Sequence, residues 1–187
     1  MTTTVKKKVN NAAYRTTIEI GASRWKQVAW YFTNILFFQN PLNLFSSLKV
    51  FLLKAFGARL GKGVVVKPSV NIKFPWKLTV GEHTWIGENV WIDNLSEVTI
   101  GSHVTLSQGC LLLTGSHDAS RETFDFLSQP IVLEDGVWIG AKAVVGGGSR
   151  CGTHSILGIN SVAEGDLEPY TIYKGNPAVP VLKRIIF

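Results

Sequence analysis

Residues Leu133–Glu168 read LEDGVW-IGAKAV-VGGGSR-CGTHSI-LGINSV-AEGDLE, a pattern that repeats every six residues. The first position of each hexad is apolar or small, namely Leu133, Ile139, Val145, Cys151, Leu157 and Ala163. The second position is glycine in four of the six hexads. An α-helix would give a period near 3.6 and a plain strand a period of two. A period of six predicts a parallel β-helix, a coil of short strands and tight turns in which the first residue points inward and glycine relieves the turn.

The same frame extends towards the N-terminus. It runs through LGKGVV-VKPSVN-IKFPWK from Leu60, VGEHTW-IGENVW-IDNLSE from Val80 and IGSHVT-LSQGCL-LLTGSH from Ile100. Three hexads make one coil, so we expect a mainly β fold of about five coils. A fifteen-residue loop, 118–132, should protrude between the third and fourth coils. The chain thus divides into an N-terminal segment (residues 1–59), the β-helix (residues 60–168) and a C-terminal tail (residues 169–187).

Composition predicts one domain with appended segments. The 187 residues are 45% hydrophobic and 17% charged, with a net charge of +6. A basic balance suits phosphorylated ligands, but no nucleic-acid-binding motif is present, and we expect no nucleic acid as partner. Cys110 and Cys151 fall at inward or corner positions, which predicts buried thiols rather than a disulfide. With no apolar segment behind the basic start, the expectation is a cytoplasmic protein.

Two helices are predicted before the coils. The first spans Arg24 to Phe38, with Ser23 as its N-cap, and the second runs from about Leu44 to Phe56 and ends at Gly57. Both are too short to cross a bilayer, which takes ~20 apolar residues. Two interpretations stay open, and both could be true. In the first, the helices cap the end of the β-helix. In the second, they rest on the inner face of a membrane as interfacial helices.

The protruding loop is the place where we expect chemistry, because it interrupts an otherwise rigid stack. His117 directly precedes it, and histidine titrates near neutral pH and can serve as a general base. Asp118 follows and could orient the ring. Asp93 lies one coil earlier on the same face and is a second candidate.

The other histidines share one position of the repeat. His83, His103 and His154 are each the fourth residue of a coil's first hexad. His83 and His103 should therefore stack on adjacent coils. A metal site needs three converging ligands, whereas His154 lies two coils from His103, so we expect turn residues and no metal.

These segments together resemble a known enzyme family, the hexapeptide-repeat acyltransferases. The likeness covers about Arg24 to Arg184 and is specific where TGSHD, the loop, GVWIGAKAVV and GNPA combine. Within this family, the chain is similar to the sugar O-acetyltransferases that act on galactosides and maltose. The segments LLKAFGARLGKG, PWKLTVG, LLLTGSHD and KGNPA are most like those of the colanic-acid branch, which modifies bacterial exopolysaccharides.

The resemblance implies a left-handed parallel β-helix that assembles as a homotrimer, with active sites between subunits. Acetyl-CoA would be the acyl donor, and His117 would fall on the family's catalytic histidine. Backbone N–H contacts to the coenzyme would fall on Ala141 and Ile159. The implied mechanism is direct transfer, in which His117 takes the proton of an acceptor hydroxyl and the Ala141 N–H meets the oxyanion.

Two positions depart from the family pattern. Gly87 stands where galactoside-type members have an asparagine for the acceptor sugar, so we expect Asp93 or Asn94 to bind the acceptor instead. Gly165 stands where those members have a lysine. Other basic residues should then bind the coenzyme phosphates, and the candidates are Lys174, Lys183 and Arg184.

Three alternatives stay open from the sequence. A carbonic anhydrase of the same fold needs three metal-binding histidines across an interface, and His117 has no companion a few residues on. A non-catalytic trimeric scaffold would not need TGSHD beside an insertion. An N-acyltransferase acting on an amino-sugar nucleotide is the nearest competitor, because it would use the same fold and base.

Overall fold

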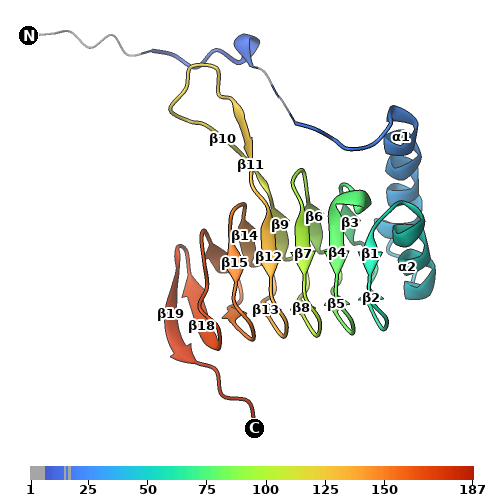
Figure 1. The fold of residues 1–187 in the computed structure, drawn as a ribbon, viewed down its shortest axis with the longest axis vertical. Helices are drawn as coiled ribbons and strands as arrows, with labels where there is room; N and C mark the ends of the chain where they lie inside the picture. The colour runs from blue at the N-terminus through green and yellow to red at the C-terminus, as the bar shows by residue number, and fades with distance from the viewer. Residues whose placement is uncertain (1–6, 15, 17) are drawn as a thin grey trace, which may run out of the picture.

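The computed structural model describes residues 7–14, 16 and 18–187 and contains a parallel β-helix with three faces (Figure 1). One sheet holds β1 (Arg59–Leu60), β4 (Leu78–Val80), β7 (Val98–Ile100), β12 (Ile131–Leu133) and β15 (Arg150–Cys151). The second holds β2 (Val65–Val66), β5 (Trp85–Ile86), β8 (Thr105–Leu106), β13 (Trp138–Ile139), β16 (Ile156–Leu157) and β18 (Thr171–Gly175). The third holds β3 (Asn71–Ile72), β6 (Trp91–Asp93), β9 (Leu111–Leu113), β14 (Val144–Gly146) and β17 (Val162–Ala163).

The register of the sheets follows the hexads. Val80, Ile100, Leu133 and Cys151 lie one above another in parallel pairs, and all four are buried. Each fully buried aliphatic side chain contributes about 1.5–3 kcal/mol relative to an exposed one. The predicted β-helix is confirmed, with five complete coils and a partial sixth, to which Leu167 adds a parallel bridge on the first face and β18 a strand on the second.

The turns explain the histidine position of the repeat. His83, His103 and His154 all have positive φ, between 54° and 57°, a conformation that short polar turn residues tolerate better than β-branched ones. The rings of His83 and His103 stack with centroids 5.4 Å apart. Within the described residues, no group of three His, Cys, Asp or Glu side chains could hold a metal ion.

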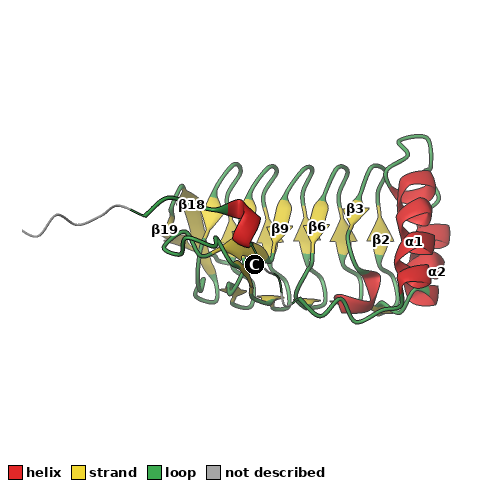
Figure 2. Ribbon diagram, turned by 90° about the horizontal axis from the view of Figure 1, so that it is seen from above, coloured by secondary structure: helices red, strands yellow, loops and turns green. Residues whose placement is uncertain are grey.

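The two ends of the coil are closed in different ways (Figure 2). At the N-terminal end lie α1 (Arg24–Thr33), the π-helical turn η2 (Asn34–Phe38) and α2 (Ser46–Ala55). Trp30, Phe38 and Leu53 are buried in the common core, so these helices pack against the N-terminal end of the coil. At the other end β19 (Ala178–Lys183) pairs antiparallel with β18. Across the residues that the structure describes, no helix is long and apolar enough to span a bilayer.

The protrusion is a β-hairpin and begins earlier than the hexads predict. Strands β10 (Gly115–His117) and β11 (Phe126–Ser128) pair antiparallel, so the insertion opens at Gly115 rather than Asp118, and Ile131 is already back in the coil. Thr114 marks the exit from the coil, because its buried hydroxyl donates to the Asp93 carbonyl across 2.9 Å. Two short 3-10 turns, η1 (Asn11–Ala13) and η3 (Pro75–Lys77), complete the elements.

Candidate active site

His117 lies on the hairpin, at the last residue of β10, and its side chain is exposed. It pairs across the hairpin with Phe126. The imidazole stacks on the ring of Phe124, with centroids 4.4 Å apart and planes at 6°. Phe126 meets it edge-on at 5.3 Å. The ring of Tyr14 lies 5.9 Å away, so three aromatic rings surround a side chain that still reaches solvent.

One hydrogen bond decides which nitrogen of His117 is available. Nδ1 lies 3.0 Å from the carbonyl oxygen of Phe124. A carbonyl can only accept, so Nδ1 carries the proton and donates, and a neutral ring then has its lone pair on Nε2. The loop backbone that makes this contact has a constrained shape, since Phe124 itself has a φ of +49°. This arrangement suits a general base that acts through Nε2.

Asp118 does not hold the ring as the sequence suggested. Its carboxylate accepts hydrogen bonds from the hydroxyl and the N–H of Ser120, at 2.5 and 3.0 Å, and pairs with Arg121 at 3.4 Å. The Ser120 hydrogen bonds, with Arg121 adding to them, hold the pKa of Asp118 below its ordinary value. Asp118 therefore shapes the loop, and the carbonyl of Phe124 occupies the position at Nδ1. Sequence reasoning missed this partner because a main-chain carbonyl has no residue-type signal.

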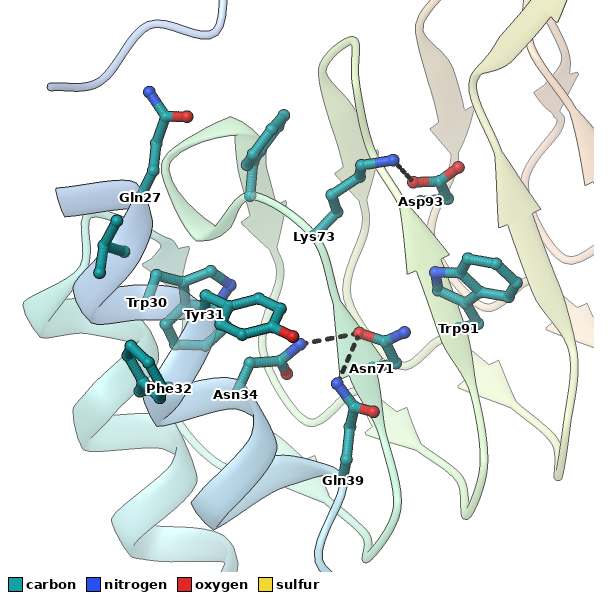
Figure 3. A pocket seen from close by; sticks show the side chains of 12 residues that line it. Gln27, Trp30, Tyr31, Phe32, Asn34, Gln39, Asn71, Lys73, Trp91 and Asp93 are labelled. Carbon is teal, nitrogen blue, oxygen red and sulfur yellow. Dashed lines mark hydrogen bonds and ion pairs between the residues drawn. The ribbon is translucent and has the colours of Figure 1, made fainter. Parts of the chain in front are cut away.

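Asp93 lies in a pocket of about 700 Å³ between α1 and the outer side of β3 and β6 (Figure 3). Its carboxylate is buried and pairs with Lys73, whose Nζ is 2.8 Å from Oδ1, in the geometry of an ion pair rather than an aligned hydrogen bond. Asn34 donates to the side-chain oxygen of Asn71 over 2.8 Å, and its own buried Oδ1 accepts no hydrogen bond within the described residues. The lining also includes Trp91. Aromatic faces beside amide and charged groups are suited to a polyhydroxylated ligand.

Asn94 is not available to a ligand. It is fully buried, and both ends of its amide bind the main chain of Phe74: Oδ1 accepts from the N–H at 2.9 Å and Nδ2 donates to the carbonyl at 2.7 Å. The side chain thus holds the bulged corner between the first and second coils. Asp93 remains a candidate for the acceptor, whereas the assignment of Asn94 is corrected to a structural role.

Ile159 lines a groove of about 540 Å³ at the corner between the second and third sheets, and Ala141 lies one coil below it at the same corner, next to Gly140 of the lining. The two turns are joined by a hydrogen bond from the Asn160 N–H to the Ala141 carbonyl, at 2.9 Å. Within the described residues, neither the Ala141 nor the Ile159 N–H has a backbone or side-chain acceptor. Both are therefore free to donate to a ligand. Gly140 keeps the stack tight, because a Cβ there would lie 2.7 Å from the Ile159 nitrogen.

The three basic residues proposed for phosphate separate into two groups. Lys174 is exposed and lines the groove. Lys183 instead donates to Glu168 at 3.0 Å and Thr171 at 2.7 Å. Arg184 donates to the carbonyls of Gly136 and His154, at 3.0 and 3.1 Å. Lys174 is therefore the candidate with access to the groove, whereas Lys183 and Arg184 fasten the C-terminal segment to the coil within this chain.

His117 and the groove lie at different corners of one chain. The hairpin leaves the coil between β9 and β12, whereas the groove is formed by the end of β13, the turn that joins β16 to β17, and strands β18 and β19. Figure 1 shows the hairpin projecting away from the coil on the side opposite β13. The base and the groove of a single chain therefore do not form one site.

Comparison with known proteins gives relatives of one kind, although no family model matches. A protein of Escherichia coli strain K12 named as a colanic acid biosynthesis acetyltransferase, WcaF, is 37% identical over 159 residues, 85% of this chain and 87% of that one. The galactoside O-acetyltransferase of the same strain is 29% identical over 67% of this chain and 64% of its own length.

Solved structures agree with the sequence relatives. A hexapeptide-repeat acetyltransferase from Vibrio cholerae, solved with acetyl coenzyme A, superposes with a TM-score of 0.76 and 28% identity, over 89% of this chain and 92% of that one. A galactoside acetyltransferase in complex with coenzyme A has the same fold, with a TM-score of 0.75 and 23% identity over 85% and 80% of the two chains. Given this fold and a relative 37% identical over most of its length, the chain is an acetyltransferase that belongs to the hexapeptide-repeat family, in the colanic acid biosynthesis branch.

Proposed function

We propose that the protein transfers the acetyl group of acetyl-CoA to a sugar hydroxyl in the biosynthesis of an exopolysaccharide or surface polysaccharide, with His117 as the general base. The observation that carries the proposal is the hydrogen bond from Nδ1 to the Phe124 carbonyl, which leaves Nε2 free to accept a proton. The acetyl-CoA and coenzyme A complexes of its structural relatives support the donor. The name of the 37% identical relative supports the polysaccharide context.

The reaction needs one base and one oxyanion donor. The acceptor hydroxyl gives its proton to Nε2 of His117 while its oxygen attacks the thioester carbonyl carbon. The tetrahedral intermediate then expels the coenzyme thiolate, which takes the proton back from the imidazolium, so the products are an acetate ester and a free thiol. The unpaired N–H of Ala141 would meet the oxyanion, a contact typically worth ~3 kcal/mol.

The separation of the two half-sites supports a homotrimer in which His117 of one copy faces the groove of the next. A mixing experiment tests this. His117→Ala removes the base, and Ile159→Asp places a carboxylate on an exposed groove residue, so each variant alone should be inactive. Co-expressed, the two should regain activity in about a quarter of the sites of random trimers, because such interfaces keep one intact base and one intact groove. No recovery would contradict a shared site.

The central test is a thiol-release assay with acetyl-CoA and a panel of sugars and lipid-linked oligosaccharides. His117→Ala should lower turnover by about 10²–10⁴-fold with coenzyme binding retained. His83→Asn is the matched control, since His83 is a turn histidine with positive φ that asparagine also tolerates. Near-full activity of His117→Ala would refute the base. An alkali-labile product indicates an ester, whereas a stable one would indicate amide formation on an amino sugar instead.

A further inference from the structure

The helices at the N-terminal end are apolar on two sides. Trp30, Phe38 and Leu53 face the coil and are buried. On the outer side, Trp25, Val28, Phe32 and Leu36 recur at helical spacing, and Trp25 is 84% exposed. The segment after α1 and the start of α2 add further exposed side chains: Leu42, Leu44, Phe45 and Phe51. A helix that is apolar all round is normally buried in protein or in lipid.

The charge of the chain is divided along the same axis. Residues 18–77, which form the helices and the first coil, hold nine basic residues and one acidic residue and so carry +8, whereas residues 78–187 hold six basic and twelve acidic residues and carry −6. Arg24 and Lys54 border the apolar stripe on α1 and α2 and are exposed. No salt bridge of the described residues involves either of them. Lys49 of α2, unlike Lys54, is buried, and it donates to two main-chain carbonyls.

From these two observations we infer that the N-terminal end, the outer faces of α1, η2 and α2 with Arg24 and Lys54, docks on the surface of an anionic lipid bilayer. Aromatic and aliphatic side chains would enter the headgroup boundary while the basic residues meet the negative lipids. The helices have 10 residues each, so they would lie on the bilayer and not cross it. A second copy is a poor occupant, since it would bring one strongly basic end against another.

Docking at this end would place the candidate acceptor pocket next to the lipid. Figure 3 shows Tyr31 and Phe32 of α1 in the same view as Asp93 and Lys73, and these residues line one pocket. If the proposed function holds, a sugar attached to a membrane lipid could enter the pocket without leaving the bilayer surface. In a trimer with parallel axes, three such ends would face the same way and bind together.

The test is sedimentation of the purified full chain with vesicles. We expect binding to vesicles of phosphatidylcholine with about one third phosphatidylglycerol, and little binding to phosphatidylcholine alone. Raising the salt from about 0.1 to about 1 M should weaken binding, because the screening length falls from about 10 to about 3 Å. Trp25→Ser/Phe32→Ser/Leu36→Ser should bind roughly tenfold or more weakly. Ile185→Ser is the matched control, an exposed apolar residue at the opposite end.

Each outcome decides the proposal. Circular dichroism and gel filtration check that the triple variant folds, which is expected because all three side chains are exposed. Equal binding by the triple variant and the wild type, or no binding of the wild type to anionic vesicles, would overturn the inference. So would a large wild-type assembly that shrinks in the triple variant, because a second copy would then cover the face. The vesicles contain no acceptor and no acetyl-CoA, so the result is independent of the proposed reaction.

Discussion

The substitution Gly115→Ala, where the hairpin leaves the coil, should impair His117 as a general base although the added methyl group contacts Phe126 and Leu95 and not the imidazole. A Cβ on Gly115 would lie 2.7 Å from Cζ of Phe126 and 3.2 Å from Cδ1 of Leu95. Favourable carbon contacts lie at about 3.5–4.0 Å, so in Gly115→Ala the phenyl ring must move by on the order of 1 Å. Phe126 is the ring that meets His117 edge-on. The imidazole should therefore be displaced with it.

The expected loss of kcat follows from the displacement of the His117 imidazole. Misplacing a catalytic group by about 1 Å can cost ~10²-fold in rate, so we expect kcat to fall roughly 10–100-fold. The KM for acetyl-CoA should stay within about twofold, since the groove lined by Ile159 and Lys174 is at another corner of the coil. The overpacking itself should cost about 1–3 kcal/mol of stability. Thiol release measures kcat and KM, and urea unfolding measures the stability.

A second substitution separates steric displacement from general damage. Phe126→Leu on the Gly115→Ala background makes room for the methyl group and should recover some of the lost kcat. Gly146→Ala is the matched control, because its Cβ would meet its nearest neighbour at an ordinary 3.4 Å. The reasoning fails if Gly115→Ala keeps wild-type kcat, or if KM rises while kcat is unchanged.

Three further predictions use the site as described. Asp118→Asn should lower kcat by less than about fivefold, because a main-chain carbonyl holds the histidine Nδ1; a loss near 10⁴-fold would restore the carboxylate as the orienting group. Lys174→Ala should raise the KM for acetyl-CoA by roughly fivefold, whereas Lys183→Ala should leave it unchanged and lower only the melting temperature. Burial raises the pKa of the Cys110 and Cys151 thiols from 9.0 to about 12. The unfolded chain therefore loses these protons first, and the free energy of unfolding should fall as pH rises from 9 towards 12. Replacing either cysteine by alanine should flatten this slope in urea titrations at several pH values.

The hexads predicted the coil well because each inward position is fixed by one residue type at one spacing. Leu133, Ile139 and Leu157 are buried as their hexad positions require. The exit of the hairpin was misplaced by three residues, since Gly115-Ser116-His117 fits the frame of the repeat equally well as a strand of the coil. Only the hydrogen bond from Thr114 to the coil below shows where the frame ends.

Three predicted ligand residues have partners within the protein. Asn94, Lys183 and Arg184 were assigned to ligands from their side-chain chemistry, and in the structure each binds main-chain or side-chain groups of the protein itself. A sequence gives the donor and does not give the distance to a competing internal acceptor. His117 differs from these residues because it lies on the hairpin outside the coil, and its Nε2 has no hydrogen-bond partner among the described residues.

The position of His117 on the hairpin suggests a reason for the insertion. A coil of hexads is rigid, and its corners present main-chain N–H groups such as that of Ala141 in a fixed column, which suits an extended coenzyme. A histidine side chain within the regular coil would not face these N–H groups. In the proposed homotrimer, the hairpin between β9 and β12 would have to reach a second copy to face that column, because it leaves the coil from another corner. The rings of Phe124 and Phe126 and the Phe124 carbonyl already orient the imidazole within one chain, and under this proposal the neighbouring copy would supply the donor groove.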